Sequence, residues 1–488
     1  MSSTDSNKRT PSVWVSLIPF AVLVALIFCI IRFFEADALG GASQVALVIS
    51  SGVAIAIGMI FYHRPWKDID DSITANIKGI GSALIILLLI GAIGGTWMVS
   101  GIVPTLICYG LKVMSPKLFL FATCIICALV SVMTGSSWTT IATLGVALVA
   151  IGSALGYSEA WTAGAIISGA YFGDKISPLS DTTVLAASSA DTPLFTHIRY
   201  MMITTVPSIT ISLVIFLVAS LCHPVSSDSQ AVMMAASLKE TFCISPWLLI
   251  VPVITGIMIA KKVPAMLTLL CAAIMAGLTA LIAQPDLIAR IGGSEILDFK
   301  SGFKGIFQTI FGDTAVSTGN TTVKELVQTS GMNGMLPTVF LIICAATFGG
   351  TLNGCGMVKS LTDALTRGIK SRTSLVSATV GTGFMSNVIM GDQYLSIILT
   401  CSIFKGLYKK EGYEDRLLSR STEDAATVTS VLIPWNSCGM TQATVLRVPT
   451  LTYLPYCFFN ILSPLMSILI AAIGYKIVRK PKQQKAEQ

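Results

Sequence analysis

Residues 172–183, FGDKISPLSDTT, bring charged and hydroxyl side chains into a stretch of the chain that is otherwise apolar. Asp174 and Asp181 would each cost several kcal/mol if they remained ionised at the middle of a bilayer. Three neighbouring hydroxyls could add oxygen ligands for a hard cation, those of Ser177, Ser180 and Thr182. This combination indicates a binding site for a small cation and a proton inside a membrane-spanning segment.

Pro178 explains how polar groups can lie at this depth. Proline lacks a backbone N–H and blocks a continuing helix, so the segment 161–187 should break near this residue. Backbone carbonyls freed at membrane depth are tolerated only where they face protein or a water-filled cavity. Lys175 is expected to act as an internal countercharge, with Asp181 or Asp392 as its partner, because its neighbour in sequence does not share its helix face.

A second stretch, farther along the chain, repeats this arrangement. Pro434, in VLIPWNSCG (431–439), aligns with Pro178 as a second helix break. Asn436 aligns with Ser180 at the same offset of 256 residues. Two glycine-rich segments, GAIGGTWMVSGIV and AATFGGTLNGCGMV, align at an offset of 255. The conserved order and the near-constant offset indicate two structural repeats, a build that many secondary transporters share.

The predicted tips of two hairpins carry further polar residues. VMTGSSWTT (132–140) and NVIMGDQY (387–394) each contain a glycine that permits a tight turn. Asp392 occupies the position of Ser136 in the repeat. Breaks and tips of this kind converge near the membrane midplane in inverted-repeat transporters. We therefore expect one cation and proton site built from eight residues, which are Asp174, Asp181, Asp392, Ser177, Ser180, Thr182, Asn387 and Asn436.

Structural roles for the three acids remain open at this point. Asp174 could cap a helix or pair with a distant lysine. Asp181 could cap the second half-helix, and Asp392 could cap the helix that returns from its hairpin. Four other ionisable residues are expected away from the site, at the membrane interface or as solvated or helix-terminal charges at span ends, namely His197, Asp363, Glu423 and Asp424.

The composition excludes a soluble protein. The chain has 488 residues, of which 53% are hydrophobic and only 12% charged, with a mean hydropathy of +0.78. A soluble chain carries about 25% charged residues. The net charge of +7 gives no indication of nucleic-acid binding, and three histidines are too few and too scattered for a metal site. We expect an integral membrane protein that is not an enzyme and needs no cofactor.

The apolar segments and the repeat predict an all-α polytopic membrane protein. It should have about ten transmembrane helices in two inverted repeats, with broken helices and with re-entrant hairpins at 118–155 and 374–404. Five regions follow from this interpretation: an N-terminal two-span segment (1–79), repeat 1 (80–222), connecting spans and extracytoplasmic loops (223–334), repeat 2 (335–476) and a basic cytoplasmic tail (477–488).

Positive charges set the expected orientation in the membrane. Cytoplasmic loops carry an excess of lysine and arginine. With the hairpins treated as re-entrant, one face collects six basic residues, namely Arg367, Lys370, Arg372, Lys405, Lys409 and Lys410. This face is predicted to be cytoplasmic, together with Lys261, Lys262 and both termini. The polar stretches 223–245 and 285–334 then lie outside the cytoplasm, and the cell (inner) membrane is the expected location.

Three motifs resemble the NhaC family of Na+/H+ antiporters, within the wider ion-transporter group of inverted-repeat carriers. They are GDKISPLSDTT (173–183), ADTPLFTHIRYM (190–201) and IPWNSCG (433–439). The overall pattern agrees from about residue 11 to about residue 478. The resemblance implies sodium–proton exchange. It also implies an alternative, because members of this family include carriers that couple ions to organic acids or amino acids.

The physical chemistry of the motif also favours an antiporter. Burial disfavours the charged form of a carboxylate, so a buried acid near neutral pH can exchange a proton for a small cation. Exclusive occupancy by Na+ or H+, combined with alternating access, yields exchange. Asp174 is the expected principal carboxylate, with Asp181 or Asp392 second. Na+ and H+ would be the substrates and the lipid bilayer the surroundings, and a homodimer is one option for the oligomeric state.

Three alternatives remain at this stage. The same fold could couple Na+ or H+ to transport or exchange of an organic acid, such as a dicarboxylate or lactate, or of an amino acid. An intramembrane aspartyl protease needs two facing aspartates, one usually in a GxGD motif. Gly173-Asp174 and Gly391-Asp392 lack the first glycine, because Tyr171 and Ile389 stand there. A passive channel would be excluded by uphill transport.

Overall fold

Helices dominate the whole molecule. The computed structural model describes residues 11–34, 41–222, 229–261, 263–314, 327–366, 369 and 371–478. Within these residues the only β-type pairing is an isolated bridge between Thr314 and Thr329. Eight of the described helices are long and apolar enough to cross a membrane, or up to ten if each of two bent pairs counts as one span. The prediction of an all-α polytopic membrane protein with broken helices is confirmed.

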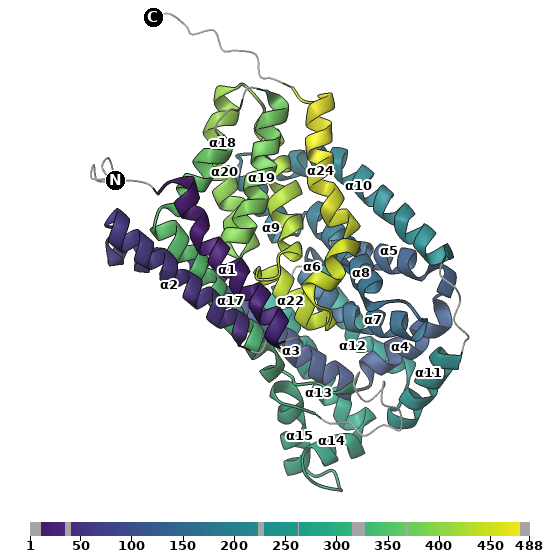
Figure 1. Ribbon diagram of the computed structural model, residues 1–488. Helices are drawn as coiled ribbons and strands as arrows, with labels where there is room; N and C mark the ends of the chain where they lie inside the picture. Colours follow the sequence, from purple (N-terminus) through teal and green to yellow (C-terminus); the bar gives the residue numbers. More distant parts are fainter. Residues whose placement is uncertain are drawn as a thin grey trace, which may run out of the picture.

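The first half of the chain contains two long N-terminal helices, a very long third helix, a series of shorter ones and a further long helix at its end (Figure 1). Their bounds are α1 (Val13–Phe34), α2 (Ala42–Tyr62), α3 (Trp66–Val99), α4 (Ile102–Val113), α5 (Phe119–Thr134), α6 (Ser137–Thr140), a π-helical turn (Ile141–Gly145), α7 (Val146–Ala154), α8 (Glu159–Ile176), α9 (Asp181–Ser189) and α10 (Leu194–Cys222).

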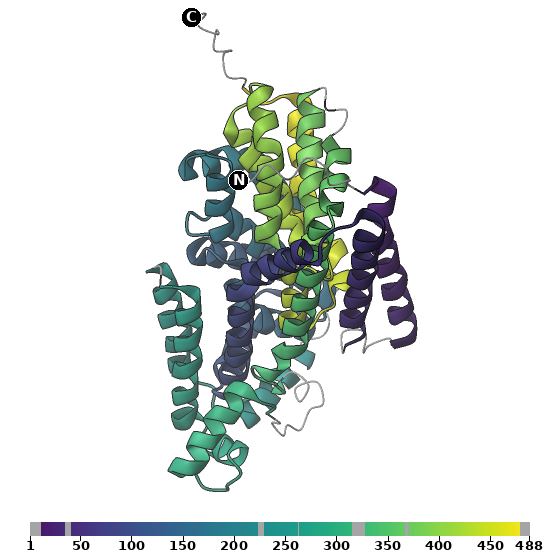
Figure 2. The same ribbon diagram turned by 90° about the vertical axis from the view of Figure 1, so that its left-hand side faces the viewer.

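The second half continues with α11 (Ser229–Thr241), α12 (Ile250–Ala260), α13 (Ala265–Ala283), α14 (Pro285–Ile291), α15 (Phe299–Phe311), α17 (Leu336–Gly354), α18 (Met357–Thr366), α19 (Arg372–Met390), α20 (Gln393–Lys410), α21 (Asp415–Thr422), a second π-helical turn (Glu423–Thr427), α22 (Ser437–Leu446), α23 (Thr450–Tyr453) and α24 (Phe458–Ile473). Figure 2 shows α1 and α2 side by side at one edge of the molecule, where they pack on α17 and α18.

The polar stretches between the repeats are more ordered than the predicted loops. Much of 223–245 forms α11, and 285–311 forms the pair α14 and α15. A capping box between Asp298 and Ser301 starts α15. One face of α15 exposes four phenylalanines at four-residue spacing, which are Phe299, Phe303, Phe307 and Phe311. An apolar face of this kind, which no described residue covers, suits contact with lipid.

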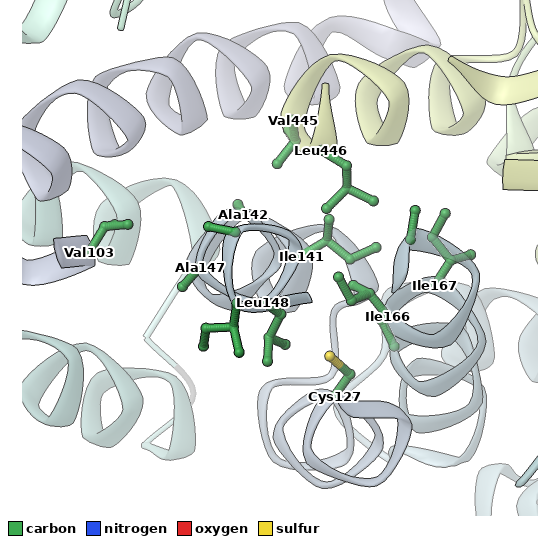
Figure 3. Close-up of a cluster of buried hydrophobic side chains, with 14 of the residues drawn as sticks. Val103, Cys127, Ile141, Ala142, Ala147, Leu148, Ile166, Ile167, Val445 and Leu446 are labelled. Atoms are coloured by element: carbon green, nitrogen blue, oxygen red, sulfur yellow. The ribbon is translucent and has the colours of Figure 1, made fainter. Parts of the chain in front are cut away.

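Two helical hairpins turn inside the molecule. The first joins α5 to α6 and α7 through Gly135, and the second joins α19 to α20 through Gly391. Both glycines have φ near 65°, in the left-handed region that favours glycine. Figure 3 shows the core around the first hairpin, where Ile141 and Leu148 lie among apolar side chains of α5, α8 and α22.

The two glycines should differ in their tolerance of a side chain. A Cβ at Gly135 would lie 2.6 Å from the backbone carbon of Leu179, whereas one at Gly391 would lie 3.2 Å from the Ala345 Cβ. The left-handed backbone alone costs alanine about 1–2 kcal/mol. We expect Gly391→Ala to lower the unfolding free energy by about that amount and Gly135→Ala to lower it more, measured by thermal unfolding in detergent. Equal losses would contradict this packing argument.

Candidate functional site

Two helix breaks and two hairpin turns form the candidate site. The chain leaves helical structure at 177–180 and 433–436, around Pro178 and Pro434, and turns at 135–136 and 391–392. Each pair is separated by the same 256 residues. The helices that follow these four points are α6, α9, α20 and α22. Figure 1 shows the short ones, α6, α9 and α22, near the centre of the molecule.

Asp174 lies in the last turn of α8, just before the first break, and is 5% exposed. Its Oδ1 accepts a hydrogen bond from Ser180 Oγ (2.6 Å). Its Oδ2 accepts two from Ser137, from Oγ (2.7 Å) and from the backbone N–H (3.1 Å). Thr182 Oγ1 lies 2.9 Å from Ser180 Oγ and extends the network. The carboxylate therefore connects a helix break to the tip of the first hairpin.

Asp392 lies at the tip of the second hairpin and is buried. Its Oδ1 accepts hydrogen bonds from the backbone N–H groups of Tyr394 (2.9 Å) and Leu395 (3.1 Å), so it caps α20. Its Oδ2 accepts a hydrogen bond from Ser437 Oγ (3.1 Å), at the second break. The capping role left open for this residue is thus present, together with a contact to the break.

The predicted neutral residues occupy both halves of the arrangement. Ser177 Oγ donates to the carbonyl of Val132, in the first hairpin (2.8 Å). Asn387 donates to the Ala426 carbonyl (2.7 Å), and Asn436 donates to the Asn387 carbonyl (3.1 Å). These side chains join hairpin to break in each half. The acceptors of these three bonds are backbone carbonyls outside the breaks themselves, so the contacts fasten each hairpin to the helical segments beside it.

Asp181 stands apart from this network. Its side chain is exposed, in the first turn of α9, and it makes no hydrogen bond or ion pair with any residue that the structure describes. Ser180, rather than Asp181, caps this helix, through the Thr183 N–H. The structure therefore brings Asp174 together with Ser180 and Thr182, but leaves Asp181 outside that cluster.

Lys175 pairs with an unexpected residue. Its Nζ forms an ion pair with Asp424 Oδ1 and donates to Ser463 Oγ (2.8 Å), and both charged side chains are fully buried. Thr204 Oγ1 donates to the same oxygen of Asp424 (3.0 Å). The predicted partners, Asp181 and Asp392, were wrong, because Lys175 points from the end of α8 toward α24 and the second π-helical turn.

Three residues expected at span ends or at the interface lie in the interior instead. Glu423, Asp424 and His197 each have 0% exposure, and His197 Nδ1 lies 2.8 Å from Ser419 Oγ. Buried Arg420 joins them: its Nε lies 3.9 Å from Asp424 Oδ2, and its guanidinium covers the Tyr200 ring at 4.7 Å. Those expectations were wrong because 422–447 is not one apolar span whose end is solvated. Applied here, the repeat offset of 256 aligns Glu423 and Asp424 with the middle of α8, and this signal would have found them.

Two contacts recur at the repeat offset. Ser131 Oγ donates to the Ala170 carbonyl (2.6 Å), and Asn387, 256 residues later, donates to the Ala426 carbonyl. The contact between Asp174 and Ser137 has a weaker counterpart between Ser430 Oγ and Gln393 Oε1 (3.4 Å). The hairpin thus packs in the same way twice against the segment before the break. Of the two equivalent residues, Asp174 and Ser430, only the first is an acid.

These features define a class of protein, a polytopic helical membrane protein with polar helix breaks in its interior, the build of secondary transporters. The chain belongs to the Na+/H+ antiporter family, whose model matches residues 7–190 and 169–475. Members of this family that match the chain are named as antiporters and not as enzymes.

Three curated relatives span almost the whole chain. The Na(+)/H(+) antiporter NhaC of Bacillus subtilis is 35% identical over 87% of this chain and 91% of its own length. The malate-2H(+)/Na(+)-lactate antiporter of the same organism is 32% identical, over 96% of both chains. The arginine/ornithine antiporter ArcD of Halobacterium salinarum is 31% identical, over 99% of this chain and 96% of its own.

Proposed function

We propose that this protein exchanges Na+ for H+ across the cell membrane by alternating access, with Na+ bound at Asp174. The proposal rests on the buried Asp174 carboxylate, which accepts hydrogen bonds from the hydroxyls of Ser180, at a helix break, and Ser137, at a hairpin tip. Family membership supports Na+ and H+ as the cargo, because NhaC of Bacillus subtilis and a second relative in addition to the three described are named Na(+)/H(+) antiporters.

The oxygens around Asp174 suit a small hard cation. Na+ would take the carboxylate together with the hydroxyl oxygens of Ser137, Ser180 and Thr182, whose hydrogens would turn away from the ion. The carbonyls of Pro178 and Leu179, which accept none of the backbone hydrogen bonds at the break, would complete the coordination. A proton must occupy the buried acids when Na+ leaves, since an ionised carboxylate in the bilayer interior is costly. Asp392 is the second candidate acid, and no cofactor is required.

Two inverted repeats, 80–222 and 335–476, would provide the alternating access. The recurring contacts between hairpin and break support them. We propose the orientation predicted from the charges, with the open end of the second hairpin in the cytoplasm and the region of α14 and α15 outside. The fold supports it, because α14 and α15 lie at the opposite end of the molecule from that open end, where α19 begins and α20 ends (Figures 1 and 2). That end carries Arg372, Lys409 and Lys410. Residues Lys262, Arg367, Lys370 and 479–488, which also entered the charge argument, lie outside the described residues.

A second candidate cargo is a small organic acid or amino acid. One cavity of about 370 Å³ is large enough for such a ligand, and its lining includes the polar side chains of Thr143, Gln328, Thr444 and Arg447. Two relatives are named for organic cargo of this kind. Asp174 does not line this cavity, and this separation favours inorganic cations at the acid site.

The test is proton flux in proteoliposomes that contain the full-length protein and a pH dye. We expect external Na+ alone, with no organic substrate, to collapse a preset pH gradient, and choline to have no effect in its place. Protein-free liposomes provide the baseline. If the gradient stays intact until an organic acid or amino acid is added, the proposed cargo is wrong and the second candidate replaces it.

A further inference from the structure

Glu423 is a buried acid for which the exchange mechanism above has no role. Its side chain is 0% exposed, and although the Thr427 hydroxyl lies close to it, neither carboxyl oxygen makes a hydrogen bond of good geometry with any described residue. Native proteins pair nearly all buried polar groups, so an unpaired buried carboxyl group requires an explanation. Burying an ionised carboxylate without a partner costs much free energy, whereas burying the protonated acid costs much less.

The backbone at Glu423 is also unusual. Glu423 begins the π-helical turn Glu423–Thr427, within an otherwise α-helical run from α21. Turns of this kind are rare and frequently lie at functional sites. The same turn carries Asp424, which pairs with Lys175, the residue next to Asp174. Glu423 and Asp174 are thus the sequence neighbours of the two residues that form one buried ion pair.

Counting the buried charges shows why these two acids should depend on each other. The cluster contains two cations, Lys175 and Arg420, and three carboxyl groups, those of Asp174, Glu423 and Asp424. With all three ionised, the cluster has one excess negative charge, which one bound cation would neutralise. A low-dielectric interior strongly favours neutrality. The cluster should therefore hold either one Na+ or one proton. Asp392 is not a member of this cluster, because its hydrogen bonds are to the start of α20 and to Ser437 and not to any of these five residues.

We infer that Glu423 is the proton-binding residue of the exchanger, distinct from the Na+ site at Asp174. Na+ and H+ then exclude each other through the charge of the cluster and not by competing for one set of ligands. Na+ at Asp174 releases the proton from Glu423, and a proton on Glu423 weakens Na+ binding. This inference rests on the proposed Na+/H+ exchange and adds where the proton resides.

Other titratable groups face this part of the interior and could contribute to a pH response. The elements packed on the π-helical turn are α9, α10, α19, α20, α21 and α24. The charged or titratable groups near Glu423, from these elements, from α8 and from the turn itself, are Asp174, Lys175, His197, Cys401, Arg420 and Asp424. The phenols of Tyr200 and Tyr408 lie beside Arg420. Among them His197 is the group to control for, through His197→Gln.

The experiment counts protons released when Na+ binds. Purified full-length protein in weakly buffered detergent is titrated with NaCl, while a pH dye reports released protons and the shift in Tm reports bound Na+. For the wild type we expect about one proton per Na+ and an apparent Na+ Kd that changes about tenfold per pH unit. Glu423→Gln should bind Na+ weakly, release almost no proton and lose the pH dependence, whereas Glu423→Asp should restore the release.

The outcomes separate the two hypotheses. If Glu423→Gln still releases about one proton per Na+, the proton resides elsewhere and the inference is overturned. The inference also fails if Glu423→Asp is folded but releases no proton, or if His197→Gln removes the release. If the wild type binds Na+ without releasing any proton, the proposed exchange itself is wrong. The exposed Glu411→Gln variant, a matched loss of one carboxylate, should behave as the wild type.

Discussion

Asp174→Asn is expected to abolish Na+-driven proton movement in proteoliposomes. Asparagine keeps the shape of the side chain and can still accept one hydrogen bond, from Ser137 or Ser180, but it has no charge to hold Na+. A lost contact between a carboxylate and a cation, worth about 3 kcal/mol, corresponds to a roughly 100-fold weaker Na+ affinity. Transport at millimolar Na+ should then fall to the level of protein-free liposomes.

Two comparisons make this result specific. Asp71→Asn removes an exposed carboxylate from α3 and should leave transport unchanged. Ser180→Ala removes one hydroxyl ligand while the charge of Asp174 remains, so we expect a partial loss, about tenfold in apparent Na+ affinity. If Asp174→Asn transports as well as the wild type, Na+ binds elsewhere, and Asp392→Asn becomes the next variant to measure.

The sequence predicts the helix breaks and hairpin turns well, for physical reasons that are local. Pro178 and Pro434 cannot continue a hydrogen-bonded helix, and Gly135 and Gly391 can adopt a left-handed turn. Each of these residues acts on its own few neighbours, so its effect needs no knowledge of the rest of the fold. The structure places a break or a turn at each of the four positions.

The partners of the buried charges could not be predicted in the same way. Lys175 and Asp424 are 249 positions apart, and their pairing depends on how the surrounding helices place the end of α8 beside the second π-helical turn. Glu423 and Asp424 lie just before an apolar run, which suggests the end of a span and a solvated charge. The local pattern does not show that they lie in the interior, which is evident from the repeat offset and from the packing of the π-helical turn that follows α21. Local sequence therefore shows where the chain breaks, but not which charges meet there.

The ion pair leads to the second large expected effect, on stability. Removing one partner of a buried pair typically costs about 3–5 kcal/mol, because an uncompensated charge remains. Asp424→Asn should lie at the upper end of this range, since it leaves both Lys175 and Arg420 without their carboxylate. Lys175→Met should lower the unfolding free energy less. In this variant Asp424 still has Arg420 nearby and still accepts hydrogen bonds from the hydroxyls of Thr204 and Ser463.

The order of the two losses tests whether Asp424 serves two cations. Thermal unfolding in detergent should give the lowest Tm for Asp424→Asn and an intermediate one for Lys175→Met. Lys175→Met combined with Asp424→Asn should be less destabilised than the sum of the single variants, because the double change leaves one unpaired cation and not two. The pair Asp191 and Lys405 lies at the surface, with side chains 53% and 34% exposed, and provides the control, since surface ion pairs contribute only about 0–1 kcal/mol. If Lys175→Met were the less stable single variant, Arg420 would not share Asp424 with Lys175. The charge count from which the role of Glu423 is inferred would then lose one of its two cations.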